Sequence, residues 1–301
     1  NQDFSTLWEA SKPIFLPGLL KKDLPSVAKD VAQTEVIVSA ILESEDASAV
    51  FDSDYYQKQI KGAFELLAPV IDESSDQEMV KFHFDALKDG QVDAENIWCK
   101  LAWLSLNESD ASLRFRFSFG LEDYEDVAAD VKRQQLTTYL AELLFAESKL
   151  VTKSEPLKDL LLTTLHEKNI SYVERIIYFN APNGGAQFHH DVERGHLGVV
   201  YAQVTGITFW FALPKQELIK EMQVYFGGLD QEQKKSIFKD SDELKSFETT
   251  LANTEALNEL LDDRNNYQTE KCIDHNSDFF KYLVKKGHAY LLEPGDVLLL
   301  P

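Results

Sequence analysis

The sequence has little of what marks secreted, membrane-spanning or nucleic-acid-binding proteins. Two cysteines, Cys99 and Cys272, stand in 301 residues, which is too few for a disulfide framework. No run of about 18 apolar residues occurs, so no membrane span is expected. The first residues, NQDFSTLWEASKP, lack the apolar stretch of a signal peptide. Together these absences predict a reducing, cytoplasmic location.

Positive charge is also scarce. The chain has 30 Lys and Arg against 51 Asp and Glu, a formal net charge of −21. Nucleic-acid binding needs clustered Lys and Arg, so no nucleic-acid partner is expected. The acidity is typical of a soluble surface, although a basic protein partner stays possible. Apolar residues make up 44% of the chain, enough for the core of one large domain or two.

Three β-type runs and one polar cluster, His189-His190-Asp191, lie between Tyr172 and Pro214. In a strand, residues two apart point to the same face, so His189 and Asp191 are expected to project together. An imidazole and a carboxylate on one face form two-thirds of the two-His-one-carboxylate site of non-haem Fe(II) oxygenases. The runs are rich in β-branched and aromatic residues and cover Val173–Phe179, Leu197–Val204 and Ile207–Leu213.

The His-x-acid spacing alone is a weak signal. With 51 acidic residues in the chain, about one such pair is expected by chance among seven histidines, and two occur. The second pair, His83 and Asp85, lies in MVKFHFDALKDG. We interpret that segment as a short amphipathic element with a solvated face, not as a metal site.

Three segments resemble the JmjC-type, cupin-like Fe(II)/2-oxoglutarate oxygenases: RIIYFNAPNGGAQFHHD, VVYAQVTGITFWFALP and EPGDVLLLP. The resemblance covers about residues 172–214 and 286–301, and KPIFLPGLL is similar to the family's opening strand. It implies a loop that leads into the H-x-D pair on a core strand. It also implies a strand–Gly206–strand hairpin from Gln203 to Pro214 and a Pro-Gly-Asp turn before a late strand.

The fold expected from this resemblance is α+β, with a double-stranded β-helix (cupin or jelly-roll) core. We expect a mainly helical part with flanking strands over residues 1–170 and the β-helix core over 171–301. A helical insertion between core strands is expected at about 215–285. The spacing of apolar residues predicts other helices at 4–11, 21–40, 55–67, 125–148 and 155–167. The alternation and composition of residues predict other strands at 97–106 and 113–119.

The resemblance implies an Fe(II) site on His189 and Asp191. The distal histidine of the family is expected beyond Pro301, because His275 and His288 are poorly placed substitutes. The resemblance also implies 2-oxoglutarate as cosubstrate, held by inward-facing polar side chains of the core strands. The candidates for this role are Tyr178, Tyr201 and Thr208.

The cosubstrate site departs from the family at one position. Many relatives place a Lys where this chain has Thr208, and no Lys or Arg occurs between Gly195 and Pro214. Pairing with the far carboxylate is then expected from Arg175 or Arg194. Otherwise 2-oxoglutarate is not the cosubstrate. In the strand at 113–119, Arg114 and Arg116 alternate with phenylalanines. They are candidates for holding an acidic ligand in a pocket, or else they form an exposed strand face beside nearby acids.

The expected function is a hydroxylase acting on a protein side chain or a small molecule. Two alternatives stay open. The chain can be a catalytically inactive cupin-like binding module, or a metal cupin enzyme that does not use 2-oxoglutarate, which the missing Lys favours. The insertion at 215–285 is expected to be a lid or substrate-binding module, or else a helical decoration or homodimer contact.

Overall fold

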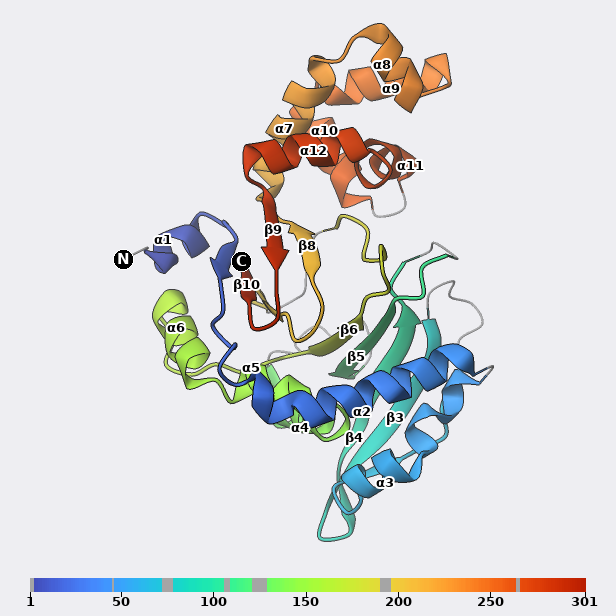
Figure 1. The fold of residues 1–301 in the computed structure, drawn as a ribbon, viewed down its shortest axis with the longest axis vertical. Helices are drawn as coiled ribbons and strands as arrows, with labels where there is room; N and C mark the ends of the chain where they lie inside the picture. The colour runs from blue at the N-terminus through green and yellow to red at the C-terminus, as the bar shows by residue number, and fades with distance from the viewer. Residues whose placement is uncertain are drawn as a thin grey trace. The chain divides into compact units, whose positions relative to one another are not determined.

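The structure, a computed structural model, describes residues 3–44, 46–71, 78–105, 109–120, 129–189, 196–263 and 266–301. It is an α+β protein with antiparallel sheets, which confirms the predicted class (Figure 1). Two compact units are formed. Unit 1 contains residues 1–17, 187–191 and 198–301, and unit 2 contains residues 18–186 and 192–197. The division of the chain predicted at residue 170 stays a prediction.

Unit 2 contains a five-stranded sheet. Its strands are β2 (Phe64–Leu66), β3 (Glu78–Lys88), β4 (Gln91–Trp103), β5 (Leu113–Phe119) and β6 (Arg175–Phe179). They pair in the order β2-β3-β4-β5-β6. Asp89 and Gly90 join β3 to β4 with φ values of 53° and 76°, the backbone that Asp-Gly favours in a hairpin turn.

Helices cover one face of this sheet and bury its phenylalanines. Those that contribute residues to this core are α2 (Leu24–Glu43), η1 (Ala47–Asp52), α3 (Asp54–Ile60) and α4 (Val131–Leu144). Further along the chain lie η3 (Ala146–Ser148), α5 (Lys149–Thr152) and α6 (Glu155–Leu165). Figure 1 shows α2, α3 and α4 along the strands. The core combines residues of these helices with Phe82, Phe84, Phe115 and Phe117, all fully buried. Each such phenylalanine stabilises the fold by roughly 1.5–3 kcal/mol through burial.

His83 and Asp85 lie on the less buried face of an amphipathic element, as interpreted, while Phe82 and Phe84 are buried on its other face. This element is the strand β3, which is longer than expected because the Asp89-Gly90 turn pairs it with β4 along its length. One helix prediction of this unit was wrong. The helix expected over residues 55–67 ends at Ile60, because Gly62 adopts a φ of 79° and the chain then continues as β2.

Unit 1 contains two small sheets. Its strands are β1 (Ile14–Leu16), β7 (Val199–Ala202), β8 (Thr208–Phe211), β9 (Ala289–Leu292) and β10 (Val297–Leu300), and α1 (Phe4–Glu9) precedes them. One sheet has the order β1-β10-β7, and the other is the pair β8-β9. Neither closes on itself within the described residues. The two sheets meet through aromatic rings. The ring centroids of Tyr201 and Trp210 are 4.6 Å apart, and those of Phe15 and Tyr290 are 6.1 Å apart.

The predicted hairpin between β7 and β8 is wrong. Gly206 does form a turn, with a φ of 64°, but this turn redirects the chain from one sheet to the other. Consequently β7 pairs with β10, and β8 pairs with β9, more than 75 residues further along the chain.

The predicted Pro-Gly-Asp turn is present before β10. Pro294 and Gly295 occupy its centre, Gly295 has a φ of 95°, and the Asp296 N–H donates to the Glu293 carbonyl oxygen at 3.0 Å. This is the pattern of a type II turn. The Asp296 carboxylate also accepts the Glu293 N–H at 2.8 Å, while Gln203 bonds to the main chain of Gly295 and Asp296. The turn therefore ties the end of β7 to the start of β10.

The segment expected as a helical insertion is helical. It contains α7 (Lys215–Gly227), α8 (Gln231–Ile237), α9 (Ser241–Leu251), α10 (Thr254–Asp262), α11 (Tyr267–Thr269), the π-helical turn η4 (Glu270–Asp274) and α12 (Ser277–Lys286). Side chains before five of these helices accept main-chain N–H groups of the first turn, which fixes where each begins. These capping residues are Asp230, Asp240, Asn253, Asn266 and Asn276. The helices enclose a second core that includes Phe226, Phe247 and Phe279.

Candidate functional site

The loop after β6 is anchored to unit 2 by Asp110 and Ser112. Asp110 Oδ2 accepts the Gly185 N–H at 3.0 Å, and Ser112 Oγ accepts the Ala181 N–H at 2.8 Å. A Cβ on Gly184 would lie 2.1 Å from Asp110 Oδ1 and 2.4 Å from Ser112 Oγ, so only glycine fits there. This anchor holds the start of the segment that leads to His189.

The Asp110 carboxylate is held in its ionised form. Burial acts to raise its pKa, but hydrogen bonds from Ser112, Gly185 and Ser105 together lower it below the ordinary value. A carboxylate that accepts several N–H and O–H groups is stabilised in this way. Asp110 and Ser112 were not candidates from the sequence, since nothing near them in the chain indicates a partner about 70 residues away.

His189, the predicted metal ligand, lies in an irregular segment of unit 1 outside any strand. Its ring nitrogen Nδ1 lies 2.6 Å from the Gln187 carbonyl oxygen. The N–H of the same peptide group, which belongs to Phe188, donates to Asp274 Oδ1 at 2.7 Å. Asp191 and Arg194 lie outside the described residues, so their predicted roles stay predictions.

Asp274, a residue of the helical insertion, was not predicted for this site. Burial raises the pKa of its carboxyl group above the ordinary value, while the Phe188 N–H and the nearby imidazoles of His275 and His189 oppose that shift. The side chain of Phe188 packs against the core of the insertion. The insertion therefore contacts the residue before His189 through both main chain and side chain.

Tyr201 and Thr208, two predicted cosubstrate ligands, lie close together in unit 1. The Tyr201 hydroxyl donates to Gln203 Oε1 at 2.8 Å. Burial raises the pKa of Tyr201, and the side chains of Thr208 and Trp210 act in the opposite direction. The Tyr201 ring on β7 lies beside the Trp210 ring on β8, with 4.6 Å between the ring centroids.

Arg175 and Tyr178, the other predicted cosubstrate ligands, lie on β6 in unit 2. Arg175 is only 7% exposed, and its Nη2 donates to the Ser148 carbonyl oxygen at 2.9 Å. Its guanidinium lies over the Tyr172 ring, 5.4 Å from the centroid, and burial lowers its pKa. Tyr178 is 36% exposed and pairs with Arg114 across the sheet. The Arg175 side chain is thus already engaged within unit 2.

Each of three other histidines, His83, His275 and His288, has its own acidic neighbour. His288 Nε2 lies 3.7 Å from Glu221, and His275 Nε2 lies 3.5 Å from Glu270. Burial and the charge of Lys81 lower the pKa of His83, and the charge of Asp85 acts in the opposite direction. Within the residues that the structure describes, no group of three or more His, Cys, Asp or Glu side chains is arranged to hold a metal ion.

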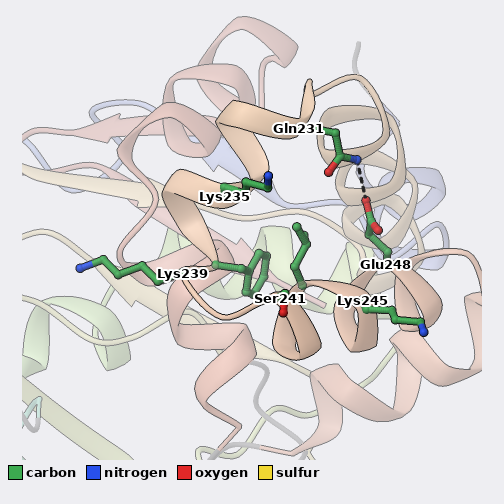
Figure 2. Close-up of a pocket in the computed structure, with 8 residues that line it drawn as sticks. Gln231, Lys235, Lys239, Ser241, Lys245 and Glu248 are labelled. Atoms are coloured by element: carbon green, nitrogen blue, oxygen red, sulfur yellow. Dashed lines mark hydrogen bonds between the residues drawn. The ribbon is translucent and has the colours of Figure 1, made fainter.

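A shallow depression between α8 and α9 brings three lysines near one another, Lys235, Lys239 and Lys245. Figure 2 shows that Lys239 and Lys245 point away in opposite directions, while Gln231 bonds to Glu248 across the depression. The ammonium groups do not converge, so this depression does not form an anion site.

Comparison of the chain with protein-family models, with curated proteins and with solved structures found no match. Among the described helices, none combines the length and the apolar composition that a membrane crossing requires.

Proposed function

We propose that unit 1 is built on a double-stranded β-helix, the fold that the resemblance implies. The order of strand pairing supports this proposal. β8 and β9 pair with each other, and β7 and β10, which flank them along the chain, pair in the other sheet. The chain therefore crosses between the two sheets after β7 and again after β9. Nested antiparallel pairs of this kind are typical of a jelly roll.

The chain is then a non-haem Fe(II)/2-oxoglutarate-dependent oxygenase, a hydroxylase of a protein side chain or a small molecule. The observation that carries this proposal is the 2.6 Å contact from His189 Nδ1 to the Gln187 carbonyl oxygen. A carbonyl oxygen only accepts, so Nδ1 carries the proton and Nε2 keeps the lone pair that a metal ion needs. Metal-binding histidines usually donate their second ring nitrogen in this way. His189 thus fits an iron ligand, and Asp191 is its proposed companion.

The residues of unit 1 have distinct proposed roles around this ligand. Fe(II) with a 2-oxo acid supplies the oxygen chemistry when bound. Tyr201 on β7 and Thr208 on β8 are proposed to hydrogen-bond the oxo acid, while Phe188 and Trp210 are proposed to supply apolar surroundings that exclude water. The insertion is proposed to recognise the substrate, with a homodimer contact as the alternative. The expected cytoplasmic location stays part of this proposal.

A metal cupin enzyme that does not use 2-oxoglutarate is the second candidate. Arg175, one of two arginines expected to pair with the far carboxylate of the cosubstrate, is buried and bonded to Ser148. A guanidinium held in this way is poorly suited to bind a diffusing dicarboxylate.

The experiment measures metal binding and cosubstrate turnover in the same preparation. Anaerobic calorimetry with Fe(II) is expected to detect one site, and Fe(II)-dependent conversion of 2-oxoglutarate to succinate is expected in air. Both signals should disappear in His189→Ala, while His166→Asn, which changes an exposed histidine at the end of α6 in unit 2, should keep them. Metal binding without succinate formation favours the second candidate. A wild-type protein that binds no metal contradicts both and leaves the inactive binding module.

A further inference from the structure

The Gln187–Phe188 peptide group joins Asp274 to His189. Its N–H, on Phe188, donates to Asp274 Oδ1 at 2.7 Å, and its carbonyl oxygen, on Gln187, lies 2.6 Å from His189 Nδ1. The described residues contain no cis peptide bond, so the N–H and C=O of this planar group point in opposite directions. Carboxylate, peptide and imidazole therefore form one hydrogen-bonded chain.

We infer that Asp274 is a positioning residue for His189 and acts through the Gln187–Phe188 peptide group. This inference rests on the proposed function, because it concerns His189 as a metal ligand. An N–H that donates to a carboxylate polarises its own peptide, which makes the Gln187 carbonyl oxygen a better acceptor. That acceptor in turn favours the Nδ1–H tautomer of His189 and makes Nε2 a stronger donor to a metal ion.

The position of Asp274 is fixed by its neighbours in the insertion. Cys272 and Ile273, just before it, are fully buried in the core of the helices. Asn276, just after it, caps α12 by accepting the Phe279 N–H at 3.0 Å. The π-helical turn η4 ends at Asp274, and such turns are frequent at functional sites. Asp274 is therefore a rigid point of attachment, and it makes the helical insertion a structural part of the proposed metal site.

Two substitutions separate the effect of the negative charge of Asp274 from the effect of its hydrogen-bond acceptor. Asp274→Asn keeps an oxygen that can accept the Phe188 N–H but removes the charge, and Asp274→Ala removes the acceptor. Asp240→Ala is the matched control, because Asp240 caps α9 in the same insertion by accepting the N–H groups of Asp242 and Glu243. That control weakens the insertion without changing the peptide before His189.

The protein is titrated anaerobically with Co(II) as a spectroscopic substitute for Fe(II). Loss of a partner that orients a metal-binding histidine costs about 10–100-fold in affinity, so Asp274→Ala is expected to bind Co(II) at least about tenfold more weakly. Asp274→Asn should recover most of this loss, and Asp240→Ala should bind as the wild type does. Nitrogen chemical shifts of the metal-free protein should report the Nδ1–H tautomer of His189 in the wild type and a mixture in Asp274→Ala.

Three outcomes decide against parts of this account. If the wild type binds Co(II) and Asp274→Ala binds equally well with an unchanged tautomer, the positioning role is wrong and the proposed function stands. If Asp240→Ala loses as much affinity as Asp274→Ala, the effect comes from general loosening of the insertion, and the positioning role is again wrong. If the wild type binds neither Co(II) nor Fe(II), the proposed function fails, and the inference fails with it.

Discussion

Arg116 on β5 and Glu174, the residue before β6, form a bidentate ion pair. Nε and Nη2 of Arg116 donate to both carboxylate oxygens at 2.9–3.2 Å. The two side chains are only 28% and 13% exposed. The sequence left open whether this arginine faces a pocket or nearby acids, and the structure contains the second arrangement. Arg116 therefore stabilises the edge of the sheet between β5 and β6.

Replacing Glu174 with Gln tests this role. The substitution removes the negative charge that the partly buried Arg116 guanidinium faces at Glu174, and the free energy of unfolding is expected to fall by about 1 kcal/mol. Urea denaturation measures it. Glu155→Gln is the control, because Glu155 Oε2 lies 3.7 Å from Lys158 Nζ and both side chains are largely exposed. This control should change the free energy of unfolding by about 0.5 kcal/mol or less. Equal effects of the two substitutions would contradict the distinction.

The close approach of Gly184 to Asp110 predicts that a methyl group there is not tolerated. Gly184→Ala would place Cβ 2.1 Å from Asp110 Oδ1, so the loop must move and its anchor must break. A loss of about 1–3 kcal/mol is expected, seen as a lower Tm. Gly227→Ala is the matched control. At the end of α7 no atom lies within 4 Å of the added Cβ, so this variant should be neutral or slightly more stable.

The lowered pKa of Asp110 predicts a pH dependence of stability. Its folded-state pKa lies below the unfolded value of about 3.9, so the carboxylate stabilises the fold above that pH, and the contribution is lost as pH falls through the folded pKa. Asp110→Asn should therefore be less stable than the wild type near neutral pH. The difference between the two proteins should shrink at about pH 3 and below. Urea denaturation at a series of pH values measures it, and a difference that stays constant with pH would contradict the assignment.

Local patterns in the sequence were enough to predict several elements. The alternation of Phe and polar residues in 113–119 predicted β5 with its buried face, and Phe115, Phe117 and Phe119 are buried. The polar, periodic segment after Pro214 predicted the helical insertion, which begins at Lys215. In both cases the side-chain period and the flanking breakers carry the information.

Partners distant in the sequence could not be predicted in the same way. The Gly206 turn indicated a hairpin, yet β7 pairs with β10, because only the packed core decides which sheet accepts a strand. The bond from Phe188 to Asp274 joins residues 86 positions apart, and an acidic side chain in an acidic chain gives no local signal. The length of the strand that carries His83 had a readable cue, since Asp89-Gly90 between two β-type runs is a strong hairpin signal.

The two cysteines provide a separate reporter for each unit. Cys99 is fully buried in the core of unit 2, and Cys272 is fully buried in the core of the insertion in unit 1. Burial raises the pKa of both thiols, and the thiolate is the reactive form, so neither should react with a thiol reagent in the native protein at about pH 8. Both should react after denaturation.

Each thiol can then be followed alone. In Cys99→Ala, the slow labelling of Cys272 should report opening of the insertion. In Cys272→Ala, the slow labelling of Cys99 should report opening of the five-stranded sheet. Rapid labelling of either thiol without denaturant would contradict its burial, because an exposed thiolate reacts without any opening of the fold.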